Sequence, residues 1–104
     1  MSEEPHSLHA IAEALRALLR AHGRGDLAAD AVGRVAFTDD GTTVYVHIFA
    51  RDDWPLRRPG QAYVLAFAEK RELQHLSQFR DLLREAWLRL QDDIDLVIRW
   101  FDGH

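Results

Sequence analysis

Histidine is the residue type in this sequence that comes closest to suggesting metal or proton-transfer chemistry, and the chain contains six histidines. His6, His9 and Glu13 would share one helical face, as zinc ligands do, if a helix began before His6. Pro5 and Ser7 indicate that the helix begins after His6, so we expect solvent-exposed polar residues instead. No cysteine is present to bind zinc or to act as a nucleophile. We predict no metal and no cofactor.

His47 is the most interesting of these histidines, because strand alternation places it on the same face as Tyr45 and Phe49. A half-buried imidazole at this position would titrate near neutral pH and could gate an interface. A hydrogen-bonded histidine within a sheet, with no further role, is the favoured interpretation.

The acidic residues do not form a recognisable catalytic or calcium site. Asp92, Asp93 and Asp95 resemble part of a calcium loop, but the glycine and the distal glutamate of that motif are missing, and turn initiation explains them better. No nucleophile elbow, phosphate-binding glycine loop or dinucleotide motif occurs. Because no pair of carboxylates is placed in a common cleft, we expect a protein without enzymatic activity.

The segment 50–60 is the strongest local candidate for binding a protein partner. Tryptophan and arginine are enriched at binding hot spots, and Pro55 and Pro59 limit the freedom that the segment would lose on binding. The predicted partner-binding residues are Asp52, Asp53, Trp54, Arg57 and Arg58. Equally well supported is the alternative that Trp54 covers a sheet edge and that the charged residues pair with one another.

Hydrophobic periodicity predicts six elements in the order αβββαβ. They are a helix over 8–22 capped by Ser7, strands over 33–38, 42–50 and 61–68, a helix over 69–91 and a strand over 94–101. Gly23 should end the first helix, Asp26 should cap a short turn over 27–31, and Asp40-Gly41 should form a hairpin. The stripe of the second helix consists of Leu73, Leu76, Phe79, Leu82, Leu83, Ala86, Trp87 and Leu90.

These elements indicate a two-layer α+β fold with a mainly antiparallel four-stranded sheet and two helices packed on one face. The second helix would make the last strand parallel to the third through a right-handed crossover. With 104 residues, the chain is predicted to form a single domain over 1–104, with residues 1–6 disordered.

The two faces of the predicted sheet differ in the size of their side chains. Small aliphatic residues, such as Val44, Val46 and Ile48, suit close packing against the helices. The opposite face is a candidate interface consisting of Tyr45, His47, Phe49, Tyr63, Phe67 and Arg99. If these aromatic residues were exposed, their apolar area would exceed the few hundred Å² usual for a patch on a monomer. A symmetric homodimer is the simplest arrangement that would bury this face. The reverse assignment, with the aromatic residues in the core, remains an alternative.

Composition narrows the range of functions. The 17 acidic and 13 basic residues are intermixed and give a net charge of −4, which disfavours nucleic acid. No apolar run approaches the roughly 20 residues that cross a bilayer, and the start is acidic, so we expect a cytoplasmic protein and no membrane contact. The favoured function is a small acidic protein-interaction module and regulator, such as an adaptor, inhibitor or chaperone, that forms a homodimer and binds a protein partner. The alternatives are an RNA-binding module with a KH-like or double-stranded-RNA-binding layout, and a small-ligand-binding protein or enzyme. The site of the latter would lie between the sheet and a dimer mate and would be lined by Tyr45, His47 and Arg99.

Overall fold

In the computed structural model, which describes residues 7–29, 35–49 and 62–103, the first element is the helix α1 (Leu8–Ala21). The hydroxyl of Ser7 accepts a hydrogen bond from the backbone N–H of Ala10 at 3.2 Å, which confirms Ser7 as the N-cap. At the other end, Gly23 takes the left-handed conformation with φ 74°, and its N–H donates to the carbonyl of Arg20 at 3.0 Å. Both ends of α1 therefore follow from local sequence.

A short helix, α2 (Gly25–Ala28), follows α1. The prediction that Asp26 caps this turn is wrong, because the N-cap position belongs to Arg24 and no side chain caps the helix there. Asp26 lies one residue inside the helix and binds the Arg24 side chain instead.

The strands β1 (Val35–Asp39) and β2 (Thr43–Phe49) form the predicted hairpin and pair antiparallel, with Thr38 opposite Tyr45. Gly41 takes a positive φ of 95° in the turn. The carboxylate of Asp40 accepts hydrogen bonds from the backbone N–H groups of Thr42 at 3.0 Å and Thr43 at 2.8 Å. These bonds fix the turn and so set the register of the two strands.

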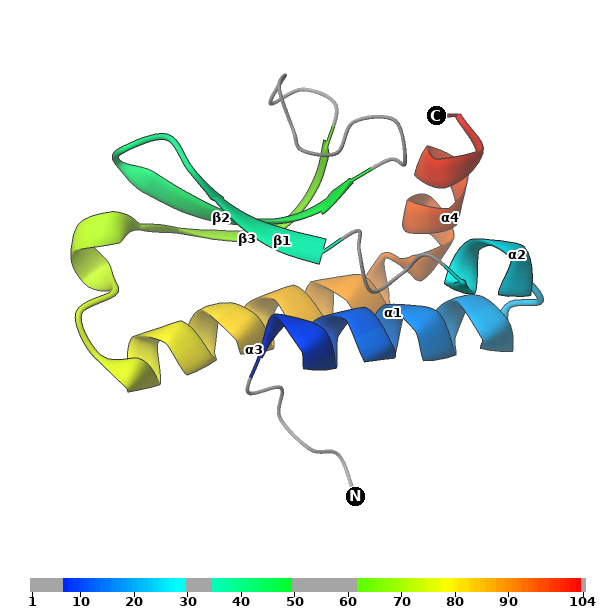
Figure 1. Ribbon diagram of the computed structural model, residues 1–104, viewed down its shortest axis with the longest axis horizontal. Helices are drawn as coiled ribbons and strands as arrows, with labels where there is room; N and C mark the ends of the chain where they lie inside the picture. The colour runs from blue at the N-terminus through cyan, green and yellow to red at the C-terminus, as the bar shows by residue number, and fades with distance from the viewer. Residues whose placement is uncertain (1–6, 30–34, 50–61, 104) are drawn as a thin grey trace.

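The third strand, β3 (Ala62–Glu69), pairs antiparallel with β2 and completes a sheet in the order β1-β2-β3 (Figure 1). Val46 lies opposite Ala66, but the next residue of β2, His47, lies opposite Val64. Leu65 is therefore an extra residue on β3, which makes a β-bulge. The bulge shifts the alternation of side chains between the two ends of β3.

The helix predicted over 69–91 is divided in the structure. A 3₁₀ helix, η4 (Lys70–Glu72), follows β3, and α3 (Leu76–Asp92) begins only after it. The side-chain oxygen of Gln78 accepts hydrogen bonds from the backbone N–H groups of Gln74 at 2.8 Å and His75 at 2.9 Å, which satisfies donors at the start of α3. The predicted stripe is confirmed at its four buried members, Leu82, Leu83, Ala86 and Leu90, whereas Leu76 is 68% exposed.

The prediction of a strand over 94–101 is wrong, because these residues form the helix α4 (Ile94–Asp102). Ile94, Val97 and Phe101 are buried together, at the three and four residue spacing of a helix, while Leu96 is half exposed. The predicted order αβββαβ, the fourth strand and the parallel crossover are not confirmed. The structure is α+β, with a three-stranded antiparallel sheet and, among the described residues, four α-helices and one 3₁₀ helix.

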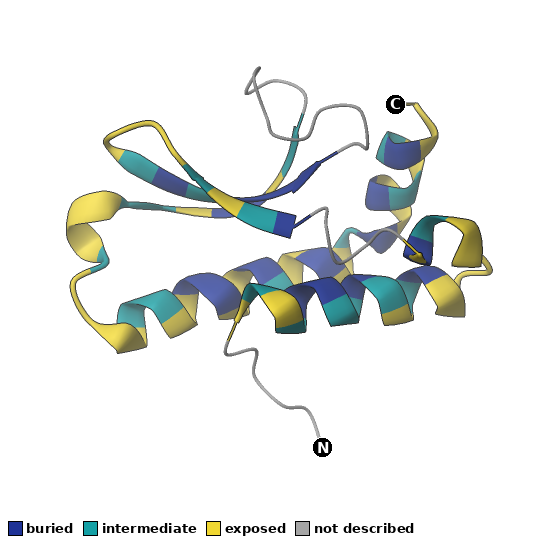
Figure 2. Cartoon of the chain, in the orientation of Figure 1, coloured by how far each residue is buried: buried dark blue, intermediate teal, exposed yellow. Residues whose placement is uncertain are grey.

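The helices α1 and α3 lie side by side against one face of the sheet, and α2 and α4 lie at one end of this pair (Figure 1). Buried residues line the surfaces on which these layers meet (Figure 2). Val44, Val46 and Ile48 belong to this core, so the prediction that the aliphatic side of β2 packs against the helices is confirmed.

Candidate functional site

The partner-binding segment predicted from the sequence lies outside the described residues. This applies to Asp52, Asp53, Trp54, Arg57 and Arg58 alike. Their role in binding stays a prediction, and the candidate surfaces that follow are built from other residues.

The sheet face opposite α1 and α3, called the outer face below, gathers most of the predicted aromatic residues. It carries Thr38, Tyr45, His47, Phe49, Val64 and Phe67. The rings form a chain of contacts, with centroid distances of 5.3 Å from Tyr45 to His47, 5.7 Å from His47 to Phe49 and 6.3 Å from Tyr45 to Phe67. Side-chain alternation along β2 and cross-strand pairing with β3 bring these residues together.

Two residues of the predicted interface do not belong to the outer face. Tyr63 lies opposite Ile48, on the helix side of the sheet, and its ring is 6.1 Å from that of Trp100 on α4. The bulge is the physical reason, because an uninterrupted alternation would have placed Tyr63 on the same face as Phe67. Arg99 is exposed on α4 and is not part of the sheet, since the predicted fourth strand is a helix.

The outer face is open at only part of its surface. His47 and Phe49 are 3% and 1% exposed, whereas Phe67 is 65% and Val64 is 41% exposed. Tyr45, which lies opposite Phe67, is half-buried. Tyr45, Val64 and Phe67 therefore make up an open patch on the outer face. This apolar surface is smaller than the predicted interface, because Phe49 is buried and Tyr63 lies on the other face.

His47 combines burial with incomplete hydrogen bonding. Its Nε2 lies 3.0 Å from the hydroxyl oxygen of Thr38, while Nδ1 has no hydrogen-bond partner within the part of the chain that the structure describes. Burial lowers the pKa of His47 below its ordinary value of 6.5, so the imidazole is neutral at pH 7. A hydroxyl beside a histidine resembles a nucleophile and its base, although among the described residues no group orients the second nitrogen of His47. A sheet histidine bonded to Thr38 accounts for this geometry.

A groove of about 500 Å³ lies between β3 and the flank of α3. Its lining residues are Leu65, Ala66, Phe67, Glu85, Leu88, Arg89, Asp92 and Asp93. The bulge residue Leu65 is buried, whereas Leu88 is 43% exposed beside Phe67. We call this feature the β3–α3 groove.

One end of the β3–α3 groove is held by a chain of polar contacts. The hydroxyl of Tyr63 donates to Oδ2 of Asp93 at 3.0 Å. A guanidinium nitrogen of Arg89 lies 3.7 Å from the same oxygen. Burial, together with the hydrogen bond to Asp93, raises the pKa of Tyr63 to about 12. Tyr63 is therefore a hydrogen-bond donor at neutral pH that fixes the carboxylate at the junction of α3 and α4.

The sequence pattern did not predict the β3–α3 groove. One signal was available, because Leu88 falls outside the apolar stripe of its helix and so places a large apolar side chain among charged residues. The position of β3 beside that flank of α3 depends on the order of the strands, which the sequence pattern left open.

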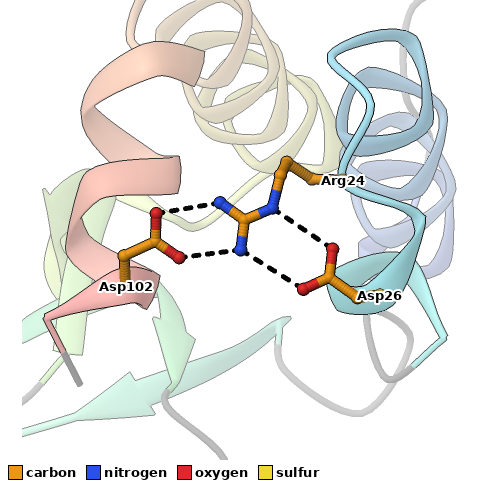
Figure 3. A network of polar contacts seen from close by, with 3 residues as sticks. All are labelled: Arg24, Asp26 and Asp102. Atoms are coloured by element: carbon orange, nitrogen blue, oxygen red, sulfur yellow. Dashed lines mark hydrogen bonds and ion pairs between the residues drawn. The ribbon is translucent and has the colours of Figure 1, made fainter.

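A polar network of Arg24, Asp26 and Asp102 joins α2 and α4 at the end of the molecule (Figure 3). The guanidinium of Arg24 donates to both Asp102 oxygens, at 2.7 and 2.8 Å, and to both Asp26 oxygens, at 3.2 Å. Hydrogen bonds from Arg24 hold the pKa of each carboxyl below its usual range. Four hydrogen bonds from one guanidinium thus connect the start of α2 to the end of α4, which indicates that the network fastens α4.

Within the described ranges, no group of three or more histidine, aspartate or glutamate side chains is placed to hold a metal ion. His9 and Glu13 lie 3.7 Å apart on α1, and His6 falls outside the description. None of the described helices is both long and apolar enough to span a membrane.

Comparisons with protein-family models, with curated proteins and with solved structures find no match for this chain. The open patch of the outer face and the β3–α3 groove are two candidate binding surfaces among the described residues.

Proposed function

We propose that this chain is a small protein-interaction module without catalytic activity, and that it forms a homodimer through the open patch of its outer face. The observation that carries the proposal is the exposure of Phe67, which is 65% accessible on the outer face and lies opposite the half-buried Tyr45. Val64, on the same strand and face, extends this apolar surface. Large apolar side chains gathered on a sheet face are typical of an interaction surface.

A two-fold arrangement suits this patch because every contact then occurs twice. Burying one large apolar side chain stabilises an association by about 1.5 to 3 kcal/mol, and the dimer buries Phe67 from both copies. The edges of the patch are polar, with Thr38 and the carboxylate of Asp40 beside Tyr45. An apolar centre with a polar rim is the usual anatomy of a protein interface.

The charges around the patch favour a protein partner over RNA. An exposed aromatic pair could stack bases, but the hydroxyl of Tyr45 donates to the Asp40 carboxylate at 3.1 Å, which places a negative charge where a phosphate would approach. The net charge of −4 acts in the same direction. The alternative of a small-ligand site lined by Tyr45, His47 and Arg99 loses its third member, because Arg99 lies on α4.

Light scattering behind a sizing column, at two concentrations of the full chain, tests the proposal. We expect the wild type to approach the mass of a dimer at the higher concentration. Phe67→Glu should weaken dimerisation by about 100-fold or more, because both copies lose an apolar contact and gain a charge.

Leu76→Glu is a matched control, since Leu76 is 68% exposed but lies at the start of α3 in the other layer. It should leave the mass of the dimer unchanged. A wild type that stays monomeric at both concentrations would contradict the dimer, and equal losses in the two variants would contradict the assignment to the outer face.

A further inference from the structure

We propose that the β3–α3 groove accepts a short extended segment of a partner protein, which adds a strand to the free edge of β3 and turns basic side chains toward α3. This inference rests on the proposed function, that the chain is an interaction module, and names the chemistry of one of its partners. Three independent features of the groove support it, namely its backbone edge, its apolar floor and its charge.

The backbone of β3 offers hydrogen-bonding groups along the groove. In the described part of the chain, β3 pairs with β2 alone. The N–H of Lys70 donates to the carbonyl of Thr42 at 2.8 Å, and bonded pairs alternate along an antiparallel ladder. Ala68 and Ala66 therefore bond toward β2, whereas the N–H and C=O groups of Phe67 and Glu69 point to the free edge. A strand that is added to a sheet binds through such groups.

The floor and rim of the groove suit side chains of two kinds. A strand beside β3 would place alternate side chains toward the outer face, where Phe67 and Val64 are exposed, and toward α3, where Leu88 is exposed. Apolar residues fit the first position. Lysine or arginine fits the second, because its methylene stem can cover Leu88 while the charged head reaches water at the rim.

The charge of the groove selects the sign of these side chains. Three carboxylates, Glu85, Asp92 and Asp93, line it against the single guanidinium of Arg89, so the lining carries a net charge of −2. Arg89 is already engaged with Asp93 at 3.7 Å. A second copy of this chain, docked here about a two-fold axis, would bring the same acidic flanks together and be repelled. The groove is therefore complementary to a basic segment of a different protein.

The bulge limits the length of the added strand. Leu65 interrupts the ladder, so the regular free edge extends from Ala66 to Glu69. A partner segment of about four to six residues matches this edge, since strand residues advance by about 3.3 Å each.

The test is a titration of the full chain with a labelled eight-residue peptide that alternates valine and arginine, followed by fluorescence anisotropy. We expect saturable binding, and no binding of the peptide that alternates valine and glutamate. A third peptide has the valine–arginine sequence with every second amide N-methylated, on the edge that would face β3. Methylation should abolish binding, because it keeps the charge but removes the hydrogen bonds to Phe67 and Glu69. Equal affinity of the methylated peptide would overturn the strand addition.

Two variants locate the site. Glu85→Lys should weaken binding by at least about tenfold, whereas Glu72→Lys, an equal change of charge on exposed η4, should have a much smaller effect. Equal weakening in both would show general charge attraction and overturn the assignment to the groove. Amide hydrogen exchange adds a second readout, because the bound peptide should protect the N–H of Phe67 and Glu69 and leave Ala66 and Ala68 unchanged.

The mass of the dimer, measured on the same samples, separates this inference from the proposed function. Absence of peptide binding with an intact dimer would overturn the groove alone. A change of mass in Glu85→Lys would show that a second copy occupies the groove, and would overturn the assignment to a basic partner.

Discussion

At the scale of single residues, His47 shows how a polar side chain is accommodated under aromatic rings. It is 3% exposed and keeps one hydrogen bond, from Nε2 to Thr38, with Tyr45 and Phe49 in contact on either side. Its neighbours on the strand could be predicted from alternation. Its depth could not, because burial depends on what covers the outer face, and strand alternation gives only the face on which a residue lies.

The lowered pKa of His47 predicts a pH dependence of folding. The imidazole of His47 titrates near pH 6.5 in the unfolded chain and below that value in the folded chain. Between these two pKa values, the unfolded state therefore binds more protons than the folded state. The free energy of unfolding should therefore be constant above about pH 7 and fall as the pH decreases below about 6.5. His47→Gln should flatten this slope in chemical denaturation between about pH 5 and 7. His9→Gln, at an exposed position on α1, is the control and should leave the slope unchanged. If His9→Gln flattens the slope and His47→Gln does not, the role of His47 is contradicted.

At the scale of elements, α3 is divided into an exposed start and a buried centre. Leu83 is 4% exposed and Leu76 is 68% exposed on the same helix. Leu83→Ala should lower the free energy of unfolding by about 2 to 5 kcal/mol, because it removes buried methyl groups and leaves a cavity. Leu76→Ala should change it by about 0.5 kcal/mol or less. Denaturation midpoints in urea measure both, and similar losses would contradict this division of the helix.

Arg24 and Asp102 connect segments that are 78 positions apart in the sequence, whereas Asp26 is two residues from Arg24. Asp102→Asn should therefore lower the melting temperature at pH 7 more than Asp26→Asn does. Since the pKa of Asp102 is lowered in the folded state, its contribution to stability is fully present above about pH 3.8. This contribution is lost as the pH falls through the pKa of Asp102 in the folded state. The difference between wild type and Asp102→Asn should disappear in strong acid. Equal melting temperatures at pH 7 would show that the network does not fasten α4.

The sequence predicted those elements whose ends are set by local chemistry. Ser7, Gly23 and Gly41 determine a helix start, a helix end and a hairpin, and each is confirmed. The strand prediction for residues 94–101 was wrong because the apolar residues of this segment fit both the period of a strand and the period of a helix. Ile94 and Val97 are buried in the core, which favours the helix. This burial is a tertiary contact, so the local sequence pattern does not reveal it.

At the scale of the whole molecule, the sheet has helices on one face and a partly open second face (Figure 1). The candidate surfaces are adjacent but chemically different. The open patch is apolar and suits a second copy, while the β3–α3 groove is acidic and suits a basic segment. Phe67 borders both, so Phe67→Glu should affect both surfaces, whereas Glu85 lines the groove and Glu85→Lys separates the groove from the dimer. The binding role of Trp54 was predicted from composition and stays a prediction, because the residue lies outside the described part of the chain.

The extra residue on β3 also bears on how the protein behaves when it is crowded. A straight, apolar edge strand is a template on which further chains can stack without end, as in amyloid. Leu65 bends this edge after a few residues, and the side chain of the bulge is directed into the core. The regular part of this edge, from Ala66 to Glu69, therefore offers few consecutive hydrogen-bonding groups to another chain. The same irregularity that shapes the groove thus shortens the template that β3 presents to neighbouring molecules.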